Sequence, residues 1–290
     1  MSIAFFVGGC TKIISIPYPD YEKKVILTGI LNPDSIISVQ LFNTLPAVSN
    51  DSIFPPITNA KVLCYENNKL LGEMKYAQNG YYRLLKNKPQ PLKKYRIEAM
   101  VNDLVVSAED SVPSSMNYNA VITAPIPNSR NNNPEVIFDK ASTTTPVYTW
   151  LFVGLYNSFY RRLQATSIAS DSPFLDTFNA NSDSNGKKAF SGEATRIKPE
   201  FMTALQFTFA PYNQLFRDST LYVQVSTVSK NYDVYLKSSI NAYQNRFTDK
   251  NGELNNPFFE PVKIYSNVKN GVGILGAIRV QRFALKNTKK

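Results

Sequence analysis

The 290-residue chain contains no histidine and only two cysteines. Without histidine there is no Ser-His-Asp triad, no Cys-His pair and no imidazole zinc site, which excludes most familiar hydrolase chemistries. Two cysteines are too few for a disulfide framework or a four-cysteine metal site, so stability has to come from packing. Apolar residues make up 43% of the chain, enough to bury the cores of one large or two ordinary domains. We therefore expect a folded protein that is not an enzyme and holds no metal or other cofactor.

Long apolar runs are also missing. The longest candidate is Val147–Leu155, which Tyr148 and Thr149 interrupt. A bilayer-spanning helix needs roughly 18 to 20 apolar residues. We therefore expect no such helix.

The chain is basic, with 32 Lys and Arg residues against 22 Asp and Glu residues and a net charge of +10. Such a balance invites comparison with nucleic-acid-binding proteins, because contacts from Lys and Arg to phosphate dominate their affinity. Here the charges are scattered over strand-like segments, and the densest group is Lys286, Lys289 and Lys290 at the end, which favours a solvated tail. We expect no nucleic-acid partner, and proximity to anionic membrane headgroups is the better alternative.

The N-terminus looks like the end of a lipoprotein signal. A short apolar run, Ile3–Val7, precedes Gly8, Gly9 and Cys10. Small residues before a cysteine allow a signal peptidase to cleave there, and the cysteine is then acylated, for example with palmitate. We predict a lipid anchor at Cys10, with residues 1–22 as a shortened signal and tether. Only nine residues precede Cys10, so we expect the precursor to begin further upstream; the alternative is a buried strand with an incidental cysteine.

Residues 23–115 predict an Ig-like or transthyretin-like β-sandwich. Segments rich in β-branched and aromatic residues recur about every 8 to 12 residues, which is the spacing of sandwich strands. Between them lie reversals such as Glu66-Asn67-Asn68 and Gln78-Asn79-Gly80, which supply positive φ or Asx turns. Cys64 lies within one segment, so we expect a buried, unreactive thiol. The predicted strands are 24–31, 37–42, 60–66, 70–75, 81–84, 94–100 and 104–110.

Residues 116–290 predict a second β-rich domain with one helix. Residues 167–188 are rich in Ser, Asp and Asn and predict a long polar loop. Within 231–244, tyrosines and aliphatic residues recur at spacings of three and four, which predicts an amphipathic helix that packs on a sheet or, alternatively, binds a partner. Residues 277–285 predict a final strand. The residues on the apolar helix face are Tyr232, Tyr235, Leu236, Ser239, Ile240 and Tyr243.

Two motifs are interpreted as structural rather than functional. Residues Gly271 to Gly276 match the Gly-x-Gly-x-x-Gly fingerprint of dinucleotide-binding proteins, but that fingerprint needs a following helix and an acidic residue roughly 20 positions on. The chain ends within fourteen residues, so we interpret these glycines as a tight bend before the final strand. Residues 181–186 resemble part of a calcium loop without its acidic first ligand or its glutamate at position twelve. We predict no metal site there.

The stretch from Leu221 to Ala277 is the most distinctive part of the sequence. It contains a Ser-x-x-Tyr-x-x-Tyr segment, an Asn-Pro-Phe-x-Glu-Pro turn and a Tyr-Ser-Asn-x-x-x-Gly-x-Gly segment. In these features the chain resembles the Bacteroidetes envelope lipoproteins grouped as domain-of-unknown-function family 4249, and looser matches extend over nearly the whole chain after Cys10. The matching residues are Ser229, Tyr232 and Tyr235; Asn256, Pro257, Phe258, Glu260 and Pro261; and Tyr265, Ser266, Asn267, Gly271, Gly273, Ile274 and Gly276.

The resemblance implies an envelope lipoprotein often encoded beside a TonB-dependent outer-membrane receptor, and it implies no catalytic residues. We therefore expect a non-catalytic, lipid-anchored outer-membrane protein that partners such a receptor in nutrient uptake, on either face of the membrane. The first alternative is a surface adhesin or fimbria-like structural subunit, which would exchange strands between copies. A glycan-degrading enzyme is the second, and it would need a cleft with two carboxylates.

A rim for a partner or ligand is expected where the Asn-Pro-Phe turn and the glycine-rich segment adjoin in sequence. The alternative is that prolines and glycines there serve only the backbone geometry. The predicted rim residues are Asn256, Pro257, Phe258, Glu260, Tyr265, Asn267, Gly271 and Gly273.

Overall fold

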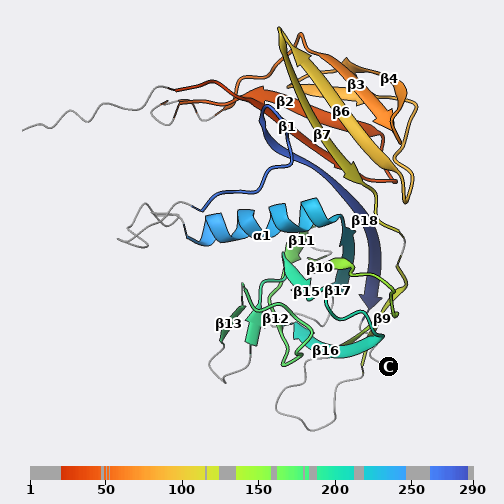
Figure 1. Cartoon of the computed structure of the whole chain (residues 1–290). Helices are drawn as coiled ribbons and strands as arrows, with labels where there is room; N and C mark the ends of the chain where they lie inside the picture. The colour runs from red at the N-terminus through yellow and green to blue at the C-terminus, as the bar shows by residue number, and fades with distance from the viewer. Residues whose placement is uncertain are drawn as a thin grey trace, which may run out of the picture.

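The computed structural model describes residues 21–46, 49, 51, 53–114, 116–123, 135–157, 162–178, 180–182, 188–211, 219–245 and 262–286. In this part of the chain the fold is mainly β with one helix, as the sequence predicts. Figure 1 shows two β-rich bodies that are joined by a long final strand. No helix in the described ranges is long and apolar enough to cross a membrane.

The first body is a β-sandwich. Along β1 and β2 every second residue is buried, because side chains of a strand alternate between the core and the outer face. Leu27, Ile97 and the predicted buried thiol of Cys64 lie in this core. Its strands are β1 (Val25–Leu31), β2 (Ile37–Asn43), β3 (Lys61–Glu66), β4 (Lys69–Tyr76), β5 (Tyr81–Leu84), β6 (Lys94–Val101) and β7 (Leu104–Ser111).

Asparagine forms the predicted reversals of this body. Asn67, Asn68, Asn79 and Asn102 have φ values between 45° and 68°, a region that asparagine tolerates better than most residues. As a result, β3 and β4, and likewise β6 and β7, fold back on each other as antiparallel hairpins.

The second body packs two sheets around its own core. One sheet contains β10, β11, β15 and β17, and the other runs in the order β13-β14-β12-β16-β9-β8. Leu151 and Val223 from the first sheet and Phe138 and Phe209 from the second belong to one buried cluster. The strands are β8 (Tyr118–Ile122), β9 (Val136–Lys140), β10 (Tyr148–Asn157), β11 (Arg162–Ala165), β12 (Ile168–Ala169), β13 (Ala180–Ser182), β14 (Lys188–Phe190), β15 (Thr195–Ile197), β16 (Leu205–Pro211) and β17 (Ser219–Val228).

The last strand, β18 (Val272–Lys286), belongs to both bodies. Its residues 272–277 run parallel to β1, and its later residues run antiparallel to β17. One sheet therefore continues from the first body into the second (Figure 1). The sequence-based division assigned every residue after 115 to the second domain, whereas 272–277 complete the first sandwich. Pairing between segments so far apart in the chain has no local sequence signal.

The helix α1 (Lys230–Gln244) agrees with the predicted helix 231–244 to within one residue. The Ser229 side chain caps it by accepting a hydrogen bond from Tyr232 N, which satisfies one of the free N–H groups of the first turn. The helix packs next to Gly276, where an added Cβ would lie 2.7 Å from the Tyr232 ring.

The glycine-rich segment agrees in part with the predicted tight bend before the final strand. Asn270 and Gly271 form a turn and a bend directly before β18, whereas Gly273 and Gly276 lie inside the strand. At Gly273, φ is +118° and a Cβ would lie 2.2 Å from Leu27 O, so glycine is needed for the close approach of β18 to β1.

The predicted polar loop 167–188 contains the short strands β12 and β13 and reaches β14. Ile168 and Leu175 of this stretch are fully buried in the core of the second body. These two side chains therefore anchor the described parts of this stretch to the core.

Candidate functional site

The described part of the predicted rim lies where the two bodies meet. Tyr265, Asn267, Gly271 and Gly273 belong to one stretch that runs from residue 262 into β18. The other predicted site residues lie outside the described ranges: Cys10, Asn256, Pro257, Phe258 and Glu260.

Residues 267–270 cover the free edge of β7. Lys269 N donates to Ser107 O at 2.7 Å, and Ser107 N donates to Lys269 O at 3.2 Å. Next to this pair, the Asn270 side chain donates to Val105 O at 3.0 Å. Unpaired groups along an edge strand would otherwise be open to pairing with a foreign strand. This segment therefore closes the first sandwich.

The Asn267 side chain bridges β7 and β18. Its Nδ2 donates to Glu109 O at 3.2 Å and to Leu275 O at 2.9 Å, while its Oδ1 accepts from Leu275 N at 3.0 Å. Leu275 is fully buried, so its backbone groups need such partners in place of water. The Asn267 amide thus substitutes for a neighbouring strand.

Asp110 places a buried carboxylate at this junction. It lies near the end of β7 and is 6% exposed. Its oxygens accept hydrogen bonds from Ser229 Oγ, from Ser111 N at 2.8 Å and from Asn231 Nδ2 at 3.3 Å. Burial raises the pKa of Asp110 from 3.8 to about 6, although these donors favour the charged form. A carboxylate of the first body thus contacts the start of α1 in the second.

Ser229 connects three elements at one hydroxyl group. Its Oγ donates to Asp110 and accepts from Tyr232 N and Ala277 N, both at 3.2 Å. Its backbone N donates to Ala277 O at 2.9 Å. The end of β7, the first turn of α1 and the middle of β18 therefore meet at this residue.

Tyr265 links the segment before β18 to α1. Its hydroxyl donates to Asn231 Oδ1 at 2.8 Å, and its backbone N donates to Ser238 Oγ at 2.9 Å.

We call this contact region between the two bodies the joint, and define it by Asp110, Ser229, Asn231, Tyr265 and Asn267. The structure therefore brings the described rim residues together, but their polar groups bind strands and helix.

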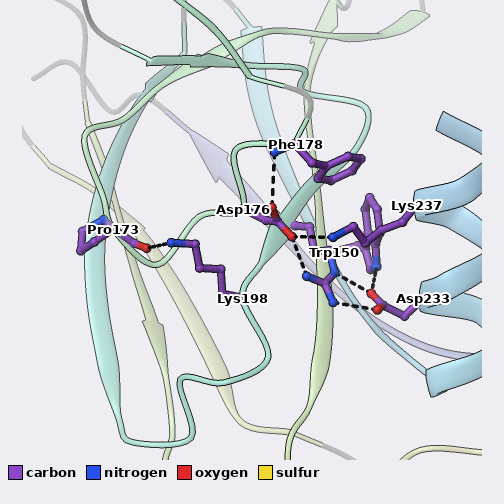
Figure 2. A network of polar contacts seen from close by, with 8 residues as sticks. Trp150, Pro173, Asp176, Phe178, Lys198, Asp233 and Lys237 are labelled. Carbon is purple, nitrogen blue, oxygen red and sulfur yellow. Dashed lines mark hydrogen bonds and ion pairs between the residues drawn. The ribbon is translucent and has the colours of Figure 1, made fainter. Parts of the chain in front are cut away.

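A second polar network lies beneath α1 (Figure 2). Asp233 is 2% exposed and accepts from Arg196 Nε at 2.7 Å, from Arg196 Nη2 at 2.7 Å and from Trp150 Nε1 at 2.9 Å. The two bonds from one guanidinium form the bidentate geometry that suits a carboxylate. Burial alone would lower the pKa of Arg196, but the Asp233 carboxylate raises it.

Asp176 extends this network toward the surface. It accepts from Arg196 Nη1 at 2.6 Å, from Lys237 Nζ at 3.1 Å and from Phe178 N at 3.3 Å. Burial alone would raise the pKa of Asp176, but the Lys237 and Arg196 cations hold it below its usual value. Two carboxylates thus face two cations, and the charges balance within the network.

No pattern in the sequence pointed to this network. Tyrosines and aliphatic residues were predicted on the packed face of the helix, yet the buried residue of α1 is Asp233. A carboxylate in a first helical turn is usually explained by the helix dipole. Nothing in the spacing pairs it with Arg196, which lies 37 positions away.

Comparison with known proteins gives the chain a family. A family model described as "Domain of unknown function (DUF4249)" matches residues 11–284. The chain belongs to this family. A search of curated proteins gave the DUF4249 chain no match.

Two solved structures match most of the DUF4249 chain, but at low similarity. One is Salmonella alpha-2-macroglobulin reacted with methylamine, with 14% identity over 93% of this chain and a TM-score of 0.25. This chain spans 15% of the length of that protein. The other is the major pilin subunit of Bacillus cereus, with 8% identity, 92% of this chain and 70% of that chain covered, and a TM-score of 0.22. Such low scores establish no shared overall architecture.

In the DUF4249 chain, the joint and the network beneath α1 hold elements together. Among the residues that the structure describes, no group of three or more Cys, Asp or Glu side chains is placed to hold a metal ion. Asp233 and Asp176 face cations, and hydrogen-bond donors surround Asp110. These carboxylates therefore hold together segments that are far apart in the chain.

Proposed function

We propose that this DUF4249 protein is a non-catalytic outer-membrane lipoprotein that binds a TonB-dependent transporter and assists nutrient uptake. The resemblance of the C-terminal motifs supports the class of partner. The Val7-Gly8-Gly9-Cys10 sequence supports a lipid anchor at Cys10. A single acyl chain binds membranes only reversibly, so a stable anchor requires more than one.

The observation that supports a non-catalytic role is that the polar groups at the joint are already bonded within the chain. Tyr265 and Asn267, which the sequence offered as rim residues, make hydrogen bonds that fix β18 against β7 and α1. The buried Arg196 guanidinium is likewise paired with carboxylates. These polar groups already have partners inside the chain. Contact with another protein is therefore expected on the outer surfaces and not at these buried networks.

The alternative of a strand-exchanging fimbria-like subunit receives less support. The strand that completes the first sandwich, β18, comes from the same chain, and residues 267–270 cover the edge of β7. In the described sheets, the edge strands β8, β11 and β13 have five, four and three residues. Short edges are poor templates for pairing with another chain.

The test is a pull-down of the full chain, carrying a C-terminal tag, from its native host. Proteins are crosslinked in intact outer membranes and identified by mass spectrometry, with a Cys10→Ala variant as the control. We expect a TonB-dependent barrel to co-purify with the wild type. The variant should lose membrane attachment and this partner together.

Two outcomes would contradict the proposal. If only copies of the same chain were recovered, the adhesin alternative would replace it. If the Cys10→Ala variant stayed in the membrane fraction, the lipid anchor would be wrong.

A further inference from the structure

Two hollows adjoin on the outer face of the six-stranded sheet. The first, about 420 Å³, lies over neighbouring ends of β8, β9 and β16. The second, about 380 Å³, lies between β16 and residues 169–174. Gln206 lines both hollows. We call them together the outer groove; the polar side chains used below are Asn119, Glu135, Asp139, Asp171, Gln206 and Thr208.

The floor of the outer groove is a row of polar side chains on three strands. Asn119 on β8 lies opposite Asp139 on β9, which lies opposite Gln206 on β16. Residues directly opposite each other in an antiparallel sheet share one face. Gln206 Nε2 donates to Asp139 Oδ1 at 2.6 Å, which fixes the orientation of both side chains.

The second hollow continues this polar surface along β16. Gln206 and Thr208 are exposed, whereas Phe207 between them is buried in the core. Ser170 Oγ donates to Thr208 O at 2.7 Å and holds the flanking segment against β16. Asp171 is the next residue of this flank and is exposed to solvent.

The charges of the outer groove are opposite to the net charge of the protein. Glu135, Asp139 and Asp171 line it, and none of them forms an ion pair within the described residues. Among the lining residues that the structure describes, the basic one is Lys140, which is 3% exposed and donates from Nζ to Phe201 O at 2.8 Å. The Lys140 ammonium is therefore already used in a buried hydrogen bond.

The side chains that line the outer groove limit the kinds of ligand that it can bind. The described lining does not favour phosphates, nucleic acids or anionic headgroups, because their recognition needs accessible Lys or Arg side chains. The first hollow is also lined by Ala141, Ala204 and Leu205, so its surface combines apolar groups with carboxylates and carboxamides. A wholly apolar ligand would leave those polar groups without partners. The wall is rich in hydrogen-bond acceptors, and so it suits a ligand that carries many hydrogen-bond donors.

We propose that the outer groove is a binding site for a neutral oligosaccharide that lies across both hollows. Closely spaced sugar hydroxyls donate to carboxylates, and carboxamides both donate to and accept from them. Hydrogen bonds to a charged acceptor are roughly twice as strong as neutral ones. Strands hold such side chains at fixed spacings, which favours recognition of a regular chain. Two adjoining hollows suit an elongated ligand better than a compact one.

A polyamine or a basic peptide is the main rival, because the groove is acidic. The two kinds of ligand respond differently to salt. Binding of a polycation to exposed carboxylates weakens as ionic strength rises, since salt screens the charges. Binding through hydrogen bonds to neutral hydroxyls changes little.

The test uses the purified full chain on an array of immobilised neutral, amino-bearing and acidic oligosaccharides, together with polylysine. The neutral oligosaccharide retained most strongly is then titrated by calorimetry at low and high salt. The variants are Gln206→Ala and Asp171→Asn, both on exposed positions. Gln78→Ala is the matched control, because Gln78 is exposed in a turn of the first body. Melting temperatures verify that every variant is folded.

We expect retention of at least one neutral oligosaccharide with little dependence on salt. Gln206→Ala should weaken binding about tenfold, because Gln206 lines both hollows and orients Asp139. Asp171→Asn should weaken it by several-fold, and Gln78→Ala should leave it unchanged.

Three results would overturn the proposal. They are no retention of any neutral oligosaccharide, equal affinity of Gln206→Ala and Gln78→Ala, or preferential binding of polylysine that is lost at high salt. The measurement requires neither a membrane anchor nor a transporter, so its outcome is independent of the function proposed above.

Discussion

The Ser229 hydroxyl that caps α1 donates a hydrogen bond to the Asp110 carboxylate, 119 positions earlier in the chain. An N-cap side chain usually serves its own helix. Here it also binds a side chain near the C-terminal end of β7. One hydroxyl group therefore links the start of α1 to the first sandwich.

Stability should depend on pH through Asp110. Its pKa is raised from 3.8 to about 6 in the folded protein, so the folded state binds this proton more tightly than the unfolded state. The resulting stabilisation is complete below pH 3.8 and is lost as pH rises through about 6. A difference of roughly two pH units corresponds to about 3 kcal/mol.

The measurement is urea unfolding of wild type and Asp110→Asn at several pH values between 4 and 7.5. Because the variant cannot ionise here, its stability relative to wild type should rise by about 2.5 kcal/mol from pH 4 to pH 7.5. Asp103→Asn, in an exposed turn, is the control and should not reproduce this trend. Parallel pH profiles for wild type and Asp110→Asn would contradict the assignment.

Removal of Arg196 should be strongly destabilising. Arg196→Ala leaves the carboxylates of Asp233 and Asp176 without their shared partner, and breaking a buried pair in this way costs about 3–5 kcal/mol. Arg282→Ala is the matched control, because Arg282 is exposed and donates to the neutral Gln224 side chain. Chemical denaturation should show a cost below about 1 kcal/mol for that surface position. Equal losses in the two variants would show that the network contributes no more than a surface contact.

Asn267→Ala should loosen the contact of β18 with β7. The variant leaves the buried Leu275 backbone without two hydrogen bonds, and each unsatisfied buried group costs about 1–3 kcal/mol. Hydrogen exchange read by mass spectrometry should accelerate in peptides that cover 267–277. Asn119→Ala, at an exposed position of the second body, serves as the control. Unchanged protection in Asn267→Ala would refute the bridging role.

Gly276→Ala should be destabilising because its Cβ would lie 2.7 Å from the Tyr232 ring. Overpacking of this kind costs about 1–3 kcal/mol. Combining it with Tyr232→Leu should recover part of that loss, because the smaller side chain gives the new methyl group room. A double-mutant cycle from denaturation curves measures the coupling, and strictly additive effects would place the strain elsewhere.

Local signals in the sequence predicted much of the fold. The alternation along β1 and β2, the asparagine reversals at Asn67 and Asn79 and the spacing of residues in α1 each depend on neighbours in the chain. Such local preferences act before any distant contact forms, and so they can be read from one sequence.

Contacts between distant segments could not be predicted in this way. The parallel pairing of β18 with β1 turned a predicted bend at Gly273 into part of a strand. Asp233 is buried beside Arg196, although aspartates are mostly exposed in proteins, and no local pattern indicates this pairing. In the candidate site, Asn267 was predicted as a rim residue for a partner or ligand; the structure shows its side chain bonded to Glu109 and Leu275, which the motif does not specify.

The shared strand β18 also sets an order of events during biosynthesis. A ribosome makes Ile26 long before Val272, with which it pairs in the finished protein. Until residues 272–277 emerge, β1 lacks its parallel neighbour, and a nascent first sandwich exposes an open side where aggregation can begin. Because contacts so far apart in the chain are slow to form, the first sandwich should close late, and a stop before residue 272 would leave both β1 and β17 without a neighbouring strand.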